Sequence, residues 1–435
     1  MAERKRIAEN VEQEIKAIMD ESDKKDKQRM KRSIYHIPAA VSTPDLNKQA
    51  YRPQVVSFGP FSTFVEMQEH KERASVHFLR RSGKPLSLFV ESLAEVVNDL
   101  RDSYGIKYYQ SIDSSLLKMM IFDGCFMLEI LHFYSDMLND YGPDDPIFSK
   151  HGKLYIMPYI RRDMLMLENQ LPMFVLEKLL AIERGAETSA EYINKLILNF
   201  FFPNTSILVR EKCAHVLDVY RRSLLQQQVS EKTHYSISED VHKDHDNVFI
   251  RSATKLNQAG IQFQKSKTRS LDDISFQSGV LKLPVIVVDE TTESIFLNLI
   301  AYERLHVLAG TEVTSYFIFM RSIIKDKQDV VLLHSKGIIQ NGLEGDQEVA
   351  KLLNSLTKIF DSLTKNIRLD PESKLYAVQK NMINACCEKS WNQWPAKTFQ
   401  YNFRINPWPI LSLVTAIILF ICTNIYLHYH NNESP

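Results

Sequence analysis

The sequence lacks a net charge, because its 53 Lys and Arg residues balance 53 Asp and Glu residues. Nucleic acids are bound mainly through the negative charge of their phosphates, which requires a basic surface on the protein. No basic cluster of that extent stands out in the chain, so we expect no nucleic-acid partner. The 44% of hydrophobic residues is nevertheless enough to bury a substantial core, as in an ordinary globular protein.

Cysteines are few, and their spacing fits neither a zinc site nor a disulfide framework. No two of the five form a Cys-x-x-Cys pair, and they are scattered over Cys125, Cys213, Cys386, Cys387 and Cys422. Reduced, mostly buried thiols are the expected state. Such thiols favour a body that faces the cytosol.

The sequence also lacks the motifs of common catalytic sites, such as a phosphate-binding loop, a dinucleotide fingerprint, a nucleophile elbow or a zinc-protease motif. Two Glu-x-x-His pairs do have the spacing found in di-iron helical bundles, Glu129 with His132 and Glu303 with His306. Such a bundle needs two more glutamates, for which Glu95 and Glu168 are candidates. About 170 residues and a predicted sheet separate the pairs, however. We therefore expect no metal, no cofactor and no catalytic residue.

Charged residues lie inside the most apolar stretches of the chain. Asp123 and Glu129 fall in one such stretch, and Arg162, Asp163 and Glu168 fall in the next. A charge in these surroundings carries a large cost unless it is paired. We interpret the five residues as a buried structural network that fixes the register of the helices. The alternative is an enzyme that uses the four carboxylates for acid–base chemistry, although no nucleophile or histidine accompanies them in sequence.

One hydrophobic run has the length of a membrane span. Residues 408–427 are 20 residues without a charge, and a helix of that length covers about 30 Å, the thickness of a bilayer core. We assign residues 408–428 to a transmembrane helix, with a buried core helix as the alternative. The residues expected to form the anchor are Trp408, Pro409, Leu411, Ile417, Phe420 and Leu427.

The charges that flank this run predict its orientation. Lys389, Lys397 and Arg404 precede it, whereas the tail at 429–435 carries only Glu433 and neutral histidines. Because the more basic side of a span stays in the cytoplasm, the body should be cytoplasmic. The N-terminus has no apolar region that could act as a signal peptide. The pattern is that of a single-pass, tail-anchored protein of the plasma membrane or an endomembrane.

The remaining chain divides by composition into a charged arm at 1–33, one helix-rich body at 34–387 and an aromatic juxtamembrane segment at 388–407. Within the body, we expect a helical part at 34–227, a mobile polar loop at 228–249, a small β region at 250–290 and C-terminal helices at 291–387. The turn at Ser278-Gly279 predicts an antiparallel hairpin. The expected fold is mainly α, with a small antiparallel sheet and one C-terminal transmembrane helix.

Apolar periodicity predicts where the helices lie, at about 62–81, 85–103, 114–139, 155–184, 211–227, 292–307, 312–325, 345–365 and 371–387. The helix at 114–139 is apolar on almost every face and should occupy the middle of a bundle. Pro172 should break or kink the next one. Thr188 and Glu191 predict a capping box for a further helix that ends near Pro203.

Several blocks of the sequence resemble a known plant family. They are IYHIP at 34–38, AYRPQVVSFGP at 50–60, EHKER at 69–73, MMIFDGCFMLEIL at 119–131, RDMLMLENQLPMFVLEKL at 162–179 and the long stretch at 259–304. These blocks look like the family catalogued as domain of unknown function 247, and the likeness extends over about 34–428. The resemblance implies a helical body, one C-terminal span and no established enzymatic activity.

The same resemblance implies a function class. Some grass members of the family lie at self-incompatibility loci and are thought to act on the pollen side. We therefore expect a non-catalytic, membrane-anchored recognition or signalling protein with a protein or peptide partner, and a pollen-side self-incompatibility determinant is the narrower form of this expectation. A membrane scaffold that recruits cytosolic partners is a further alternative.

Overall fold

A computed structural model describes most of the body of the protein. The residues it describes are 11–12, 14–16, 19, 31–38, 48–61, 67–106, 113–135, 137–138, 140–203, 207–226, 251–341, 369 and 373–385. The predicted loop at 228–249, the helix at 345–365, the juxtamembrane segment and the transmembrane helix fall outside this set. None of the helices within the set has both the length and the apolar character needed to cross a bilayer.

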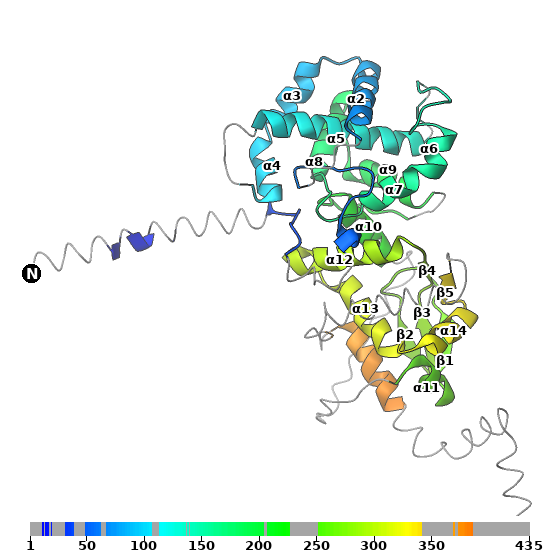
Figure 1. Cartoon of the computed structure of the whole chain (residues 1–435). Coiled ribbons are helices and arrows are strands. Elements are labelled where there is room, and N and C mark those ends of the chain that lie inside the picture. Colours follow the sequence, from blue (N-terminus) through cyan, green and yellow to red (C-terminus); the bar gives the residue numbers. More distant parts are fainter. Residues whose placement is uncertain are drawn as a thin grey trace, which may run out of the picture.

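The N-terminal half packs around one central helix, α5 (Asp113–Tyr134). This helix is buried from Met120 to His132 apart from Phe122, which confirms the central position predicted from its apolar sequence. Gly124 lets α8 approach closely, because a Cβ at this position would lie 2.4 Å from Leu179 Cδ1. Figure 1 shows α5 crossing the upper part of the molecule among its neighbours, which are α2 (Gln68–Ser82), α3 (Leu86–Ala94), α4 (Val97–Tyr104), α8 (Met173–Arg184) and α9 (Ala190–Phe201).

The other helices are shorter or lie nearer the C-terminal half. They are α6 (Lys150–Tyr155), α7 (Met157–Asp163), α10 (Val216–Leu225), α11 (Ala253–Gln258), α12 (Thr292–Leu305), α13 (Glu312–Ile323) and α14 (Lys327–Ser335), with 3₁₀ turns η1 (Lys48–Tyr51) and η2 (Val307–Ala309). A last helix covers 374–385. At the N-terminus the described residues between 11 and 19 are helical and exposed, and Lys16 pairs with Glu12 at 2.7 Å.

Three helix boundaries differ from the sequence-based expectation. The region 85–103 is two helices, since the α3 helix ends at Ala94 and α4 begins at Val97. The helix expected at 155–184 is broken before Pro172, as predicted, but the break is wide, because a nine-residue turn at 164–172 separates α7 from α8. The cap of α9 is Ser189, whose hydroxyl accepts from the backbone N–H of Tyr192 at 3.2 Å, whereas Thr188 Oγ1 is buried and has no hydrogen-bond partner in the described part of the chain.

The sheet is mixed, and the prediction of a purely antiparallel sheet was wrong. The hairpin across Ser278-Gly279 is present, with β2 (Ser275–Gln277) antiparallel to β3 (Val280–Leu283). The strand β1 (Gln262–Lys265) instead pairs in parallel with β3, on its other side. The order of the strands in the sheet is β1-β3-β2, so the chain leaves β1, crosses to the far side of the sheet and forms β2 there. The hairpin then brings β3 back between them, parallel to β1. A second parallel pair joins β4 (Ile286–Val288) to β5 (Ile339–Asn341).

The two halves share one core. In Figure 1 the helices α2–α10 lie above α12, and the strands lie below it with α11, α13 and α14. Buried apolar side chains from both groups form one continuous cluster, which extends from Ile34 to Met382. The free thiols of Cys125 and Cys213 are buried within it.

Candidate functional site

The predicted charged residues lie mostly around one extended segment, the strap (residues 48–61). After η1 the strap follows an irregular path against α5, α12 and the turn at 164–172. No backbone-to-backbone hydrogen bond holds Gln54 to Gly59 in the described part of the chain. A buried backbone must still satisfy its N–H and C=O groups, so side chains have to supply the partners.

Asp163 supplies three of these partners. Its carboxylate accepts from the backbone N–H groups of Gln54, Val55 and Val56, at 2.9, 2.7 and 3.0 Å. The Arg162 guanidinium donates a further bond at 3.0 Å. Burial raises the pKa of Asp163, and these hydrogen bonds oppose that rise because they stabilise the charged form. The carboxylate therefore acts as a fixed acceptor for the strap.

Arg162 and Asn298 hold the beginning of the strap by its carbonyl groups. The guanidinium of Arg162 donates to the carbonyls of Gln49 at 2.6 Å and Arg52 at 3.2 Å. The Asn298 amide, from α12, donates to the carbonyl of Ala50 at 3.0 Å. These bonds join the two halves of the molecule through the strap.

Asn169 holds the middle of the strap, although sequence reasoning did not single it out. Its Oδ1 accepts from the N–H of Phe58 at 2.6 Å, and its Nδ2 donates to the carbonyl of Val56 at 3.0 Å. The same Nδ2 donates to the carbonyl of Asp163 at 2.9 Å, which ties the turn to the end of α7. Asp163 at the end of α7 and Asn169 in the turn that follows thus both bind the backbone of the strap.

Asp123 and Lys71 form a buried ion pair at the end of the strap. The Lys71 ammonium lies 2.6 Å from Asp123 Oδ1 and also donates to the Ser57 carbonyl, and the N–H of Gly59 donates to Asp123 Oδ2 at 2.8 Å. Both side chains are at most 5% exposed. Burial raises the pKa of Asp123, which the nearby lysine opposes. Gly59 has φ of 70°, and a Cβ there would lie 2.8 Å from the Tyr104 hydroxyl, so no larger residue fits.

Glu129 belongs to a separate group, the Arg81 cluster, whose members are Arg81, Glu129, Asp140, Tyr141 and Glu183. Glu129 is fully buried, pairs with the Arg81 guanidinium and accepts from the Tyr141 hydroxyl at 2.5 Å. Arg81 also lies 3.2 Å from Asp140 and 3.7 Å from Glu183. Burial raises the pKa of Glu129 and raises that of Glu183 to about 7. The single guanidinium of Arg81 thus lies within ion-pair distance of three carboxylates.

His132 lies beside this cluster. Its Nε2 is 3.7 Å from Glu183 Oε2 and has no hydrogen-bond partner among the residues that the structure describes, and the residue is 3% exposed. Burial lowers the pKa of His132 to about 4. A neutral imidazole next to a carboxyl group that titrates near neutrality makes the stability of this region depend on pH.

A Glu183→Gln substitution should change that dependence. The pKa of Glu183 is raised by folding, from 4.5 to about 7, so the stability it contributes at low pH is lost as the pH rises through this window. The glutamine variant lacks this loss and should gain stability relative to the wild type between about pH 5 and pH 8. Urea unfolding of the full-length protein in detergent micelles at the two pH values measures the change. If the free energy of unfolding differed between the variant and the wild type by the same amount at both pH values, Glu183 would not titrate over this range in the folded protein.

Glu168 departs from the expected buried network. Its side chain is 27% exposed, accepts from the N–H of Ile37 at 2.6 Å and lies 3.3 Å from His36 Nδ1. The five predicted residues therefore form three groups. Arg162, Asp163 and Asp123 bind the strap, Glu129 binds Arg81, and Glu168 binds the segment at 36–37. Sequence reasoning also missed the partners Lys71, Arg81, Asn169 and Glu183, because no local pattern marks them.

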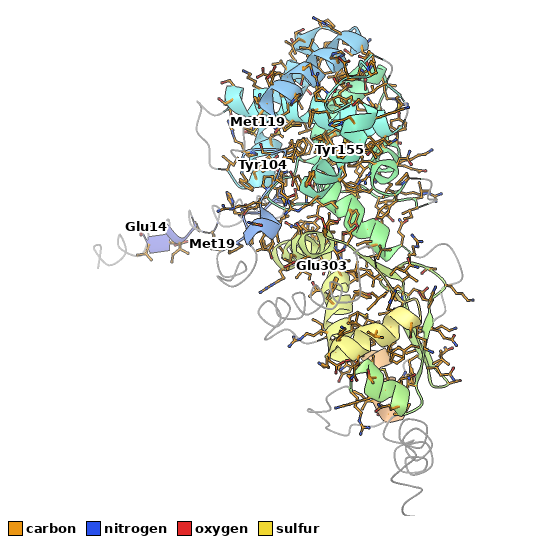
Figure 2. All side chains as sticks on the ribbon, turned by 45° about the vertical axis from the view of Figure 1, so that its right-hand side comes forward. Glu14, Met19, Tyr104, Met119, Tyr155 and Glu303 are labelled. Carbon is orange, nitrogen blue, oxygen red and sulfur yellow. The ribbon has the colours of Figure 1, made fainter. Side chains whose placement is uncertain are left out.

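The two Glu-x-x-His pairs do not come together. Glu303 accepts from Arg221 Nε at 2.8 Å and from the N–H groups of Val313 and Thr314 at 3.0 and 2.8 Å, and so fixes the start of α13. Figure 2 shows Glu303 below Tyr104 and Met119, the latter of which lies on α5, the helix that carries the other pair. Over the residues that the structure describes, no group of three or more His, Cys, Asp or Glu side chains is placed to hold a metal ion.

An exposed apolar face lies on the outside of α6 and α7. Its large side chains are Leu154, Tyr155 and Tyr159, which are 69%, 61% and 49% exposed. Tyr155 is labelled in Figure 2. Apolar groups that gather on a surface are typical of sites that contact other proteins or membranes.

Comparison with known proteins identifies the family. The sequence profile of DUF247, described as a plant protein of unknown function, matches residues 34–422. The chain belongs to this family. A curated relative, the UPF0481 protein At3g47200 of Arabidopsis thaliana, is 26% identical over 423 residues, which covers 90% of this chain and 84% of the relative. Another UPF0481 protein of the same plant, At3g02645, is 22% identical over 96% of this chain and 93% of its own length. No solved structure matches the chain significantly.

Proposed function

We propose that this member of the plant family is a non-catalytic recognition or signalling protein, anchored in a membrane by residues 408–428. The observation that carries the proposal is the pairing of its buried carboxylates. Asp163 and Asp123 are bonded to the strap, and Glu129 is bonded to Arg81 and Tyr141. A catalytic carboxylate must reach a substrate, whereas these three use their oxygens to hold the chain together.

The position of the carboxylates also argues against catalysis. Active sites are usually concave pockets with a few polar groups directed inward. A pocket beside β1 is lined by none of Asp123, Glu129, Asp163 and Glu168. An enzyme that uses these four groups would need them around one cavity, but they belong to three separate groups of contacts. The enzyme alternative is therefore weaker than recognition.

The uncharged run at 408–427 and the three basic residues before it support a single span with a cytoplasmic body. A body tethered in this way would meet a protein or peptide partner at the membrane surface. The exposed face of Leu154, Tyr155 and Tyr159 is consistent with such contacts. Pollen-side self-incompatibility in grasses is a narrower form of the proposal, supported by resemblance alone, and a scaffold that recruits cytosolic proteins is another.

Glu168→Gln tests the non-catalytic proposal, because Glu168 is the carboxylate among the four that substitution should disturb least. Glutamine keeps an oxygen that can accept the N–H of Ile37, so the variant should accumulate normally and melt within a few degrees of the wild type. We expect it to restore the phenotype of a plant line that lacks the endogenous protein. Glu95→Gln is the matched control, since Glu95 is 72% exposed and pairs with Lys178. A Glu168→Gln protein of normal abundance that fails to restore the phenotype would favour the enzyme.

A further inference from the structure

One side of α6 and α7 reverses the usual distribution of side chains on an outer helix. The two helices are separated by Ile156 alone, so they form almost one helical run, and Figure 1 shows α6 at the outer edge of the bundle. Gly152, Met157 and Ile160 are buried on the side that faces the core. The outward side, which normally carries polar groups, also carries large apolar ones. Its exposed members, together called the α6–α7 face, are Lys150, Lys153, Leu154, Tyr155 and Tyr159.

The apolar members of this face are accessible and lie together. Tyr155 and Tyr159 are four residues apart in the helical run, so their side chains lie on the same side of it, and Leu154 is next to Tyr155. Each of the three is at least 49% exposed. A tyrosine ring with an apolar body and a polar hydroxyl suits the interface between lipid headgroups and acyl chains. A leucine beside it can enter the apolar layer.

The charge of the face is positive. The stretch 146–162 holds two lysines, two arginines and one histidine, but no aspartate or glutamate. Lys150 and Lys153 are exposed, and neither has an ion-pair partner in the part of the chain that the structure describes. The Lys153 ammonium lies 5.0 Å from the centre of the Tyr134 ring, a contact that leaves its charge uncompensated. The cytoplasmic leaflet of a membrane is anionic and attracts such lysines.

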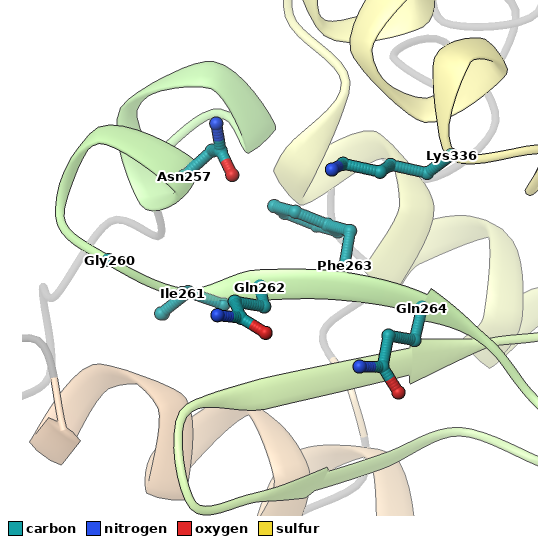
Figure 3. Close-up of a pocket in the computed structure, with 7 residues that line it drawn as sticks. All are labelled: Asn257, Gly260, Ile261, Gln262, Phe263, Gln264 and Lys336. Carbon is teal, nitrogen blue, oxygen red and sulfur yellow. The ribbon is translucent and has the colours of Figure 1, made fainter.

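The pocket beside β1 lacks this combination. Figure 3 shows Lys336 at the pocket, so a positive charge is present there too. The two apolar side chains in its lining, Ile261 and Phe263, are only 1% and 3% exposed. A bilayer could act on that lysine by charge alone, whereas the α6–α7 face offers it both charge and exposed apolar groups.

We propose that the α6–α7 face lies on the surface of the membrane that anchors the chain, with Leu154, Tyr155 and Tyr159 in the interfacial layer. Lys150 and Lys153 then lie beside anionic headgroups. This inference rests on the proposed anchor and adds a second membrane contact, which holds the body in one orientation.

The length of the chain before the expected span permits this contact. Residues 386–407 follow the last described helix, and a segment of that length reaches at most about 75 Å. The body can therefore turn one side toward the bilayer. Of the two kinds of contact that an exposed apolar face allows, a protein or a membrane, the basic charge favours the membrane.

The full-length protein is reconstituted in lipid nanodiscs of phosphatidylcholine, either alone or with about 30% phosphatidylserine to make the surface negative. Hydrogen exchange reports the contact, and backbone amides within 150–160 should exchange about threefold or more slowly in the anionic discs. Tyr155→Trp reports the depth, because lipids brominated on their acyl chains should quench its fluorescence. Leu86→Trp is the matched control, since Leu86 is 55% exposed on α3, away from α6 in Figure 1, and should not be quenched. The three native tryptophans are common to both variants.

The part played by charge is measured as partition onto vesicles that contain phosphatidylserine. Sedimentation is carried out with the full-length chain in which Ile417 and Phe420 are both replaced by Arg, because two charges in the run should prevent insertion. In that chain, Lys150→Glu together with Lys153→Glu should lower the partition coefficient about tenfold or more.

Two further pairs of substitutions complete the measurement. Leu154→Ser together with Tyr155→Ser removes apolar groups and should lower the partition coefficient about tenfold. Lys84→Glu together with Lys336→Glu is the matched control, because it changes the net charge equally at exposed lysines outside the α6–α7 face. That control should lower partition by less than about threefold. Circular dichroism of each variant confirms that a lost contact does not reflect an unfolded protein.

The outcomes separate this inference from the anchor on which it rests. Equal exchange within 150–160 in the two kinds of disc, or partition that neither pair of substitutions in the face changes, would overturn the assignment of the face to the bilayer. Substitutions that leave partition unchanged but abolish the plant phenotype would assign the face to a partner protein instead. Partition does not depend on the span, so a wild-type chain that fails to enter nanodiscs would refute the anchor alone.

Discussion

Asp163→Asn should strongly destabilise the protein. The carboxylate accepts from three backbone N–H groups of the strap and from Arg162. Asparagine replaces one oxygen by an NH₂ group that faces other donors, and it removes the negative charge that pairs with the buried Arg162 guanidinium. Breaking a buried pair in this way costs about 3–5 kcal/mol. That is a large part of the roughly 5–15 kcal/mol that holds a typical domain folded.

The effect should be large because side chains, and not a sheet, supply the hydrogen-bond partners of this part of the strap. Gln54 to Gly59 make no backbone-to-backbone hydrogen bond within the described residues, so Asp163, Asn169 and Asp123 provide the partners that a sheet would otherwise supply. A melting temperature lowered by about 4–7 °C is the expected result for a cooperative body of this size. Thermal unfolding of the full-length protein in micelles, followed by circular dichroism, measures it.

Glu168→Gln is the control for this experiment, since it removes a nearby charge whose side chain is 27% exposed. Limited proteolysis adds a local measurement, because a released strap should be cleaved within 48–61 before the helices are. An Asp163→Asn protein that melts within about 2 °C of the wild type would contradict the role assigned to the carboxylate.

The features that sequence predicts best are those set by local patterns. The apolar character of α5 on every side predicted its burial, and the Ser278-Gly279 turn predicted the hairpin of β2 and β3. Pro172 predicted an interruption because it cannot donate a backbone hydrogen bond inside a helix. The charges inside apolar stretches indicated that partners must exist, since unpaired buried charges are costly.

The identity of those partners could not be predicted from local pattern. Asp123 pairs with Lys71 across 52 positions, and Asp163 binds Gln54 across 109. Such pairs depend on how the helices and the strap pack, which no spacing in the sequence reveals. The same reason explains the parallel pairing of β1, because the path of the chain around β3 decides its direction. Glu168 was predicted to be buried, but its side chain is 27% exposed. A position next to buried residues in the sequence need not itself be buried.

Removing residues 406–435 should release the protein from the membrane, the largest change in behaviour that we expect from any single alteration. The deleted segment contains the 20-residue run without a charge, whose insertion into a bilayer is favourable by a few tenths of a kcal/mol for each Leu, Ile, Val or Phe. The rest of the chain carries a core of its own, so the truncated protein should stay folded. The measurement is the distribution between soluble and pelleted fractions after a sodium carbonate wash.

A replacement of Ile417 and Phe420 by Arg in the full-length chain is the matched test, because two charges near the middle of the run should prevent insertion while the chain keeps its length. Protease treatment of sealed vesicles then tests the orientation. The body should be digested, since Lys389, Lys397 and Arg404 place more positive charge on its side of the run. A truncated protein that still pellets after the wash would overturn the assignment of the anchor. A body protected inside the vesicles would reverse the topology.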